Sequence, residues 1–132
     1  MHSESPKRVL VVDDEAPVIA MLEEALVEAG YEVDGAGSGS EALQLIRDKL
    51  YDAAIFDFDL PDVNGVMLHR QVREMDEELA ANTIFISGKA QSDVDMSYYV
   101  SDAGGFFSKP FNVWEVLGAV RKIAAPDTDG SP

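Results

Sequence analysis

The chain has 132 residues, 46% of them hydrophobic, which fits a single domain with one packed core. It contains no cysteine, so disulfides, thiolate metal sites and cysteine nucleophiles are excluded. The formal net charge of −15 argues against binding to nucleic-acid phosphates. Because the sequence also contains no apolar run of the roughly 18 to 20 residues that span a bilayer, we expect a cytoplasmic protein that binds neither nucleic acid nor a membrane.

Short apolar runs alternate along the chain with longer amphipathic stretches. This pattern is typical of strands buried on both faces and of the helices that cover them. The predicted strands are residues 9–12, 31–36, 53–56, 83–86 and 105–108. Successive β-α units joined by right-handed crossovers predict an α/β fold, a doubly wound parallel sheet.

The stretches between these strands contain helix start and stop signals. Pro17 suits the first turn of a first helix, and Gly30 suits its C-terminal stop. Ser38 with Glu41 forms a capping-box pattern ahead of a second helix. The remaining predicted helices are residues 65–74, the more polar residues 93–102, and a last helix after the capping pair Asn112 and Glu115.

The two ends differ in composition from the middle of the chain. Residues 126–132 are rich in Pro, Asp, Gly and Ser, as linkers often are. We expect residues 1–7 to be a flexible segment and 8–125 to be the domain. Residues 126–132 would be a flexible tail or the start of a removed linker.

Charged and hydroxyl side chains lie where four of the predicted strands end. Asp13 and Asp14 follow the first strand, Asp57 follows the third, Ser87 ends the fourth and Lys109 ends the fifth. The carboxyl ends of parallel strands meet in one crevice, so three carboxylates would share a small volume. Like charges raise carboxylate pKa values unless a cation neutralises them, and an all-oxygen set suits Mg²⁺. A lysine beside such a set also suits a site that receives a phosphoryl group.

Asp57 is the best candidate for the nucleophile. A carboxylate can attack phosphorus to form an acyl phosphate, and the Ser87 hydroxyl could then bond to the attached group. Taken singly, an aspartate after a strand is more often a turn or capping residue, and a serine is usually on the surface. Their joint occurrence at the strand ends favours phosphoryl transfer.

Four blocks of the sequence, separated by helix-length gaps, resemble the motifs of response regulator receiver domains, in the order of that family. The blocks are Val11-Val12-Asp13-Asp14-Glu15, Phe56-Asp57-Phe58-Asp59-Leu60-Pro61-Asp62-Val63-Asn64-Gly65, Ile86-Ser87-Gly88 and Ala103-Gly104-Gly105-Phe106-Phe107-Ser108-Lys109-Pro110-Phe111. The resemblance covers roughly residues 8–125. It implies a flavodoxin-like (βα)5 sandwich with sheet order 2-1-3-4-5. It also implies a chemotaxis-regulator-like phosphoacceptor of a two-component phosphorelay, which is regulatory and not an enzyme in the sense of substrate turnover.

The resemblance also implies roles for the acids. Asp57 matches the phosphorylated aspartate. Asp14 matches the acid that contacts Mg²⁺ directly, and Asp13 the acid that acts through water. Asp59 matches the ligand that acts through its backbone carbonyl.

The same resemblance implies a switch. Ser87 matches the switch hydroxyl and Lys109 the family lysine, with a cis peptide bond expected at Lys109-Pro110. Phosphorylation would draw the hydroxyl inward and rotate Phe106 after it, reshaping the face built from the fourth helix, the fifth strand and the fifth helix. Ordinary core packing is the alternative for Phe106.

Three further aromatic residues lie on or near that face. Trp and Tyr are enriched in binding hot spots, so Trp114, Tyr98 and Tyr99 are candidates for a partner interface. Half-buried packing is the alternative for Trp114. The implied partners are a histidine kinase or histidine phosphotransfer protein and a downstream protein effector. Because these residues leave no room for a DNA-binding module, we expect a stand-alone regulator or one whose output domain was removed.

The chain departs from the family pattern beside the site. Gly88 stands where the family commonly has a small residue such as Ala, so access to the phosphoryl group should be unobstructed. Asp59 and Lys89 occupy the flanking positions associated with phosphoryl lifetime. We expect either an ion pair between them that shields Asp57 from water or two separate solvated charges.

Two other functions compete with the receiver. The run Ile55-Phe56-Asp57-Phe58-Asp59 also resembles the opening motif of haloacid-dehalogenase-type phosphatases, with Asp57 as nucleophile and Asp59 as acid/base. That family places this motif near its N-terminus, whereas here Asp13 and Asp14 lie upstream. The other alternative is a receiver that binds a partner without being phosphorylated.

Overall fold

The computed structural model describes residues 6–88 and 103–126. Five parallel strands form one sheet in the order β2-β1-β3-β4-β5. The strands are β1 (Arg8–Val12), β2 (Glu32–Ala36), β3 (Ala53–Asp57), β4 (Thr83–Ser87) and β5 (Gly105–Ser108). The predicted doubly wound sheet and its strand order are confirmed. Outside the described residues lie the predicted helix at 93–102, Lys89, Tyr98, Tyr99 and the terminal residues 1–5 and 127–132.

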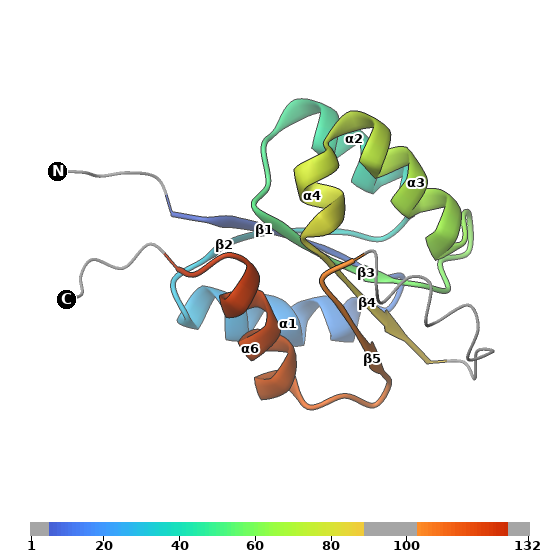
Figure 1. Ribbon diagram of the computed structural model, residues 1–132. Coiled ribbons are helices and arrows are strands. Elements are labelled where there is room, and N and C mark those ends of the chain that lie inside the picture. Colours follow the sequence, from blue (N-terminus) through green and yellow to red (C-terminus); the bar gives the residue numbers. More distant parts are fainter. Residues whose placement is uncertain (1–5, 89–102, 127–132) are drawn as a thin grey trace, which may run out of the picture.

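Helices cover both faces of the sheet. They are α1 (Ala16–Glu28), α2 (Gly39–Asp48), α3 (Gly65–Met75), α4 (Glu77–Ala81) and α6 (Val113–Ile123). Figure 1 shows α1 and α6 on one side of the sheet and α2, α3 and α4 on the other. Within the described ranges, no helix has the length and apolar character needed to cross a membrane.

The predicted capping residues act as expected. The Ser38 hydroxyl accepts a hydrogen bond from the backbone N–H of Glu41 at 3.2 Å, at the start of α2. Asn112 accepts from the backbone N–H of Trp114 at 2.8 Å, at the start of α6. Gly30 has a φ of 105°, which lies in the left-handed region that glycine adopts readily, and it ends the turn after α1. The local signals in the sequence therefore position three of the helices.

The short helix α4 was not predicted. Asp76 ends α3 in an extended conformation, and its side chain accepts a hydrogen bond from the backbone N–H of Leu79 at 3.0 Å. One residue therefore stops one helix and caps the next. A helix of five residues has too few apolar positions to show a helical period, which is why the pattern missed it.

The core lies in two layers, one on each face of the sheet. Along β1, Leu10 and Val12 point into the layer beneath α2 and α3, whereas Val9 and Val11 point into the layer beneath α1 and α6. All four are fully buried. Burial on both faces explains the continuous apolar runs of the strands and holds their carboxyl ends in place.

The loop after β3 is fixed by a close approach between Phe58 and Gly65. The Gly65 N–H donates to the Phe58 carbonyl at 2.9 Å, and a Cβ at Gly65 would lie 2.4 Å from Cδ1 of the Phe58 ring. That ring packs edge-on against Phe85, with 5.6 Å between ring centroids. Only glycine therefore fits at position 65 without displacing a core aromatic ring.

We predict that Gly65→Ala lowers the free energy of unfolding by about 1 to 3 kcal/mol, because the new methyl group overpacks the core. The matched control is Gly118→Ala in α6, where a Cβ would meet nothing within 4 Å. That variant should gain about 0.5 to 1 kcal/mol from the higher helix propensity of alanine. Urea unfolding of both variants checks the prediction, and equal effects at the two positions would contradict it.

Candidate functional site

The carboxyl ends of β1, β3, β4 and β5 bring the predicted site residues together. Asp13 and Asp14 follow β1, Asp57 is the last residue of β3, Ser87 is the last residue of β4, and Lys109 follows β5. The strand ladder extends one residue further than predicted at two ends, so Asp57 and Ser87 belong to the sheet itself. Their backbones are thus held by the same hydrogen bonds that form the core.

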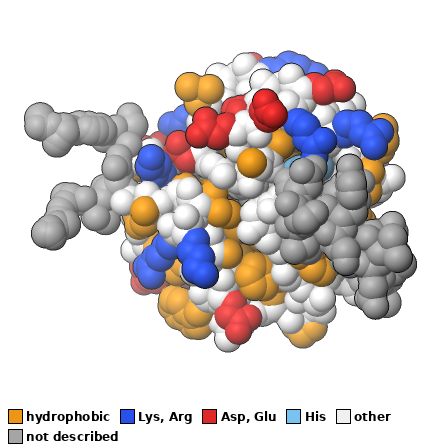
Figure 2. Space-filling model, in the orientation of Figure 1, with side chains coloured by type: hydrophobic (Ala, Val, Ile, Leu, Met, Phe, Trp, Pro, Cys, Tyr) orange, Lys and Arg blue, Asp and Glu red, His pale blue; other side chains and the backbone are white. Residues whose placement is uncertain are grey.

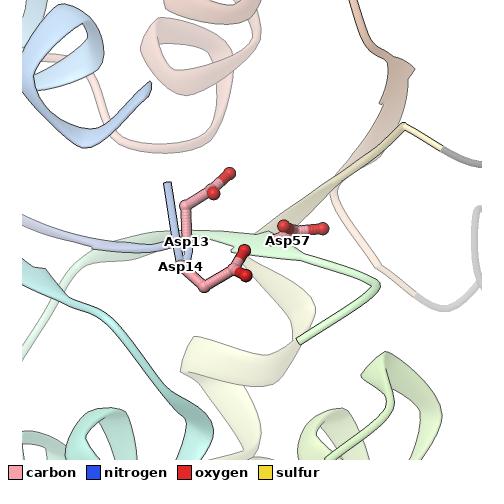
Figure 3. A group of neighbouring side chains, drawn as sticks. All are labelled: Asp13, Asp14 and Asp57. Carbon is pink, nitrogen blue, oxygen red and sulfur yellow. The ribbon is translucent and has the colours of Figure 1, made fainter. Parts of the chain in front are cut away.

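Three carboxylates form the centre of the site. Asp13, Asp14 and Asp57 each offer an oxygen that lies within 4.8 Å of the other two. Figure 3 shows these three side chains gathered at the ends of β1 and β3. Asp13 and Asp57 are 0% and 3% exposed, whereas Asp14 is open to solvent. Clustered oxygen donors of this kind fit a hard divalent cation such as Mg²⁺.

Among the described residues, Lys109 supplies a positive charge to this cluster. Its Nζ lies 2.9 Å from Oδ2 of Asp13 and 3.3 Å from Oδ2 of Asp57. Burial lowers the pKa of the Lys109 ammonium, but the hydrogen bond to Asp13 and the charges of Asp57 and Asp13 outweigh it, so the pKa is raised above its ordinary value. Lys109 therefore stays charged at neutral pH. The expected cis bond at Lys109-Pro110 is present.

Burial is the main influence on Asp57 and raises the pKa of its carboxyl group. The charge of Asp13 raises it further. Two influences act in the opposite direction: the Asp59 N–H donates to Oδ1 at 2.9 Å, and Lys109 pairs with Oδ2. The net pKa remains raised, so ionisation of the Asp57 carboxyl group lowers the stability of the fold.

Asp59 and Ser87 form a contact that the sequence did not reveal. The Ser87 hydroxyl donates to Oδ2 of Asp59 at 2.6 Å. Asp59 is half-buried and Ser87 is 1% exposed. Lys89, the other member of the expected ion pair, lies outside the described residues, so that expectation stays a prediction. The metal-ligand role expected for the Asp59 carbonyl likewise stays a prediction.

A pocket opens over the cluster. Its rim includes Glu15, which the sequence reasoning did not single out although it directly follows the acidic pair. The Glu15 N–H donates to Oδ1 of Asp13 at 2.8 Å, and its carboxylate lies 3.5 Å from the Lys109 ammonium. A Cβ at Gly88 would lie 3.5 Å from the Lys109 side chain, which is ordinary contact, so alanine would also fit there. The residues that line the pocket are Asp14, Glu15, Asp57, Asp59, Gly88 and Lys109.

Two of the predicted switch and interface residues are described. Phe106 on β5 is half-buried and packs against the core layer beneath α2 and α3. Trp114 on the first turn of α6 is 68% exposed, which is more than half-buried packing would leave. The exposure of Trp114 agrees with its position off the apolar stripe of that helix.

Residues 9–121 match the family model described as the response regulator receiver domain. The chain belongs to this family. Membership decides between the receiver and the haloacid-dehalogenase-like phosphatase in favour of the receiver, a regulatory domain of two-component systems.

Individual proteins that match this chain are consistent with this family, and they differ in length. The chemotaxis protein CheY of Thermotoga maritima is 32% identical over 119 residues, which cover 89% of this chain and 98% of CheY. The transcriptional regulatory protein PrrA of Mycobacterium leprae is 32% identical over 119 residues, which cover 90% of this chain and 50% of PrrA. The chain thus spans about half the length of the transcriptional regulators it matches.

A solved structure shares both the fold and a comparable level of identity. The crystal structure of the response regulator TrrA from Thermotoga maritima, in complex with Mg(2+)-BeF, superposes with a TM-score of 0.76 at 32% identity. The match covers 89% of this chain and 98% of TrrA.

We predict that Asp57→Asn raises the free energy of unfolding at pH 7 in metal-free buffer, because it removes the charge whose burial raises the Asp57 pKa. A carboxyl with a raised folded-state pKa binds more protons when folded than when unfolded, so its penalty disappears as the pH falls through that pKa. The advantage of the variant should therefore shrink between pH 7 and about pH 4. Urea unfolding at several pH values measures this.

The matched control for this prediction is Asp48→Asn, which changes an exposed acid in α2, outside the site. The same pH dependence in both variants would contradict the prediction, since the effect would then belong to the overall charge of the chain and not to the buried cluster.

Proposed function

We propose that this chain is the phosphoacceptor switch of a two-component phosphorelay, and that Asp57 receives the phosphoryl group from a histidine kinase or a histidine phosphotransfer protein. The observation that carries the proposal is the environment of Asp57. Its carboxylate is buried between the acid Asp13 and the Lys109 ammonium, and it faces an open pocket. The nucleophilic carboxylate of Asp57 thus lies beside a cation and beside a pocket that can admit a phosphodonor.

The carboxylate cluster fits Mg²⁺, which would be held by Asp13, Asp14 and Asp57 together with the backbone carbonyl of Asp59. Bound Mg²⁺ supplies positive charge that offsets the carboxylates and the transferred group. The Mg(2+)-BeF complex of TrrA supports this assignment.

Each of several residues of the chain would then have one role in the phosphoryl transfer. An Asp57 oxygen bonds to phosphorus as the bond from phosphorus to the donor imidazole nitrogen breaks, and the imidazole leaves with that electron pair. Lys109, whose charge is secured by its neighbours, pairs with the phosphoryl oxygens. The Ser87 hydroxyl donates a hydrogen bond to the attached group, and Phe106 follows its movement.

The output of the switch would be a protein contact. Trp114 and Phe106 lie on α6 and β5, and an exposed tryptophan at a helix start suits a partner interface. On the face shown in Figure 2, Lys and Arg side chains occur in separate groups beside Asp and Glu, not in one basic patch. With a net charge of −15, this supports a regulator that does not act directly on nucleic acid. The proposed place of action is the cytoplasm, and the proposed target is a protein effector.

The domain would comprise residues 8–125. We further propose that the chain is not an enzyme of substrate turnover, since the group accepted by Asp57 is itself the signal. Phosphorylation and its loss would then be self-catalysed by the same site.

We predict that incubation with Mg²⁺ and acetyl phosphate adds one phosphoryl group to the wild type, because the donor's acyl phosphate can pass its phosphoryl group to Asp57. Intact mass spectrometry measures the gain. It should be lost in Asp57→Ala and when Mg²⁺ is chelated, whereas Asp48→Ala should retain it. No gain with any phosphodonor would contradict the proposal and favour a receiver that binds its partner without phosphorylation.

A further inference from the structure

The hydroxyl of Ser87 already has a partner in this structure. It donates to Oδ2 of Asp59 at 2.6 Å, a length typical of hydrogen bonds from hydroxyl groups to carboxylates. Ser87 is 1% exposed, so bulk water competes little with this bond. The contact joins the end of β4 to the loop after β3.

The backbone holds Asp59 in place for this contact. The Asp59 N–H donates to the Asp57 carboxylate at 2.9 Å, and Asp59 forms an isolated antiparallel bridge with Asn64. Just before it, the Phe58 N–H donates to the Ile86 carbonyl at 2.7 Å. The acceptor that faces Ser87 is therefore carried by a segment tied to β3, β4 and its own loop.

The contact also places Asp59 at the pocket. Asp59 is among the described residues that line it, whereas Ser87 is not. A serine hydroxyl has one proton and can donate to one acceptor at a time. A phosphoryl group on Asp57 and the carboxylate of Asp59 would therefore compete for the same donor.

We propose that Asp59 is a competing acceptor that holds the Ser87 hydroxyl away from the phosphoryl site. The hydrogen bond between them would thereby stabilise the unphosphorylated conformation relative to the phosphorylated one. This inference rests on the function proposed above and adds a residue that sets its equilibrium. Asp59 is a positioning residue here, because it acts through Ser87. Removing its carboxylate should release the hydroxyl and favour the phosphorylated form.

A simpler effect of Asp59 would be charge alone. A carboxylate beside the pocket repels any anion bound there, with or without Ser87. The two explanations differ for Asp59→Asn, which keeps a neutral acceptor for the hydroxyl but loses the charge. They differ again in a Ser87→Ala background, where no hydroxyl remains to be held.

The experiment is a calorimetric titration of the full chain with beryllofluoride in saturating Mg²⁺. Asp59→Ala should bind beryllofluoride about tenfold more tightly than wild type, which corresponds to about 1.4 kcal/mol. Asp59→Asn should be intermediate. In the Ser87→Ala background, the effect of Asp59→Ala should fall below about threefold, because the competition no longer exists.

The possible results distinguish failure of the competing-acceptor role of Asp59 from failure of the proposed phosphoacceptor function. An equal gain from Asp59→Ala in both backgrounds, or equal affinities for Asp59→Ala and Asp59→Asn, would overturn the competing acceptor and leave charge repulsion. Binding by wild type with no gain in Asp59→Ala would overturn it as well. Failure of wild type and every variant to bind would overturn the proposed function together with the inference. Binding by Asp59→Ala alone would support both.

Discussion

The concentration of negative charge at the carboxyl edge of the sheet is the constraint on which the site depends. Asp13 and Asp57 are almost completely buried, and a buried carboxylate is costly unless an opposite charge or hydrogen bonds compensate it. Lys109 supplies one positive charge, within 3.3 Å of both. Among the described residues, this one ammonium faces three carboxylates, so that part of the chain leaves the cluster short of positive charge. A divalent cation would correct this deficit, and under the proposed function it would also offset the charge of an incoming phosphoryl group.

The scaffold determines where this charge lies. The strands that end at the site are buried on both faces, and their side chains interlock with two helix layers, so their ends cannot move apart without opening the core. The loop after β3 is equally constrained, since Phe58 enters the core and Gly65 closes against it. The acids are therefore fixed before any ligand binds. Pre-organisation of this kind is what allows a few charged groups to act in a small pocket.

Much of the fold and of the site can be predicted from the sequence, because both depend on patterns that recur along the whole chain. These patterns are the apolar runs and the polar residues that follow them. The five apolar runs predict buried strands, and the rule that parallel strands meet at their carboxyl ends brings Asp13, Asp57 and Lys109 together without any knowledge of side-chain positions. The capping roles of Ser38 and Asn112 follow from local hydrogen-bonding chemistry.

Other features depend on choices that the sequence pattern does not express. The helix α4 is too short to show a period, and it exists because Asp76 both ends α3 and caps the next turn. The hydrogen bond between Ser87 and Asp59 depends on the rotamers of two side chains, one at the end of β4 and the other in the loop after β3. The sequence suggested Lys89 as the partner of Asp59, because opposite charges are easily paired by inspection, whereas a hydroxyl donor gives no such signal.

The side chain of Asp59 can be changed without disturbing the fold or the carboxylate cluster of the site. Asp59 stabilises the loop through its backbone. Its N–H donates to the Asp57 carboxylate, and it forms a bridge with Asn64. Its side chain accepts a hydrogen bond from the Ser87 hydroxyl instead. Under the proposed function, changes to the acids of the cluster or to Lys109 would alter the chemistry itself, because each of them would contact the metal ion or the phosphoryl group. A change in the side chain at position 59 can leave the sheet, the cluster and the loop intact, and it would still alter how readily Ser87 turns toward Asp57. If Ser87 is the switch residue as proposed, the equilibrium of the switch would therefore be separable from its chemistry at this residue.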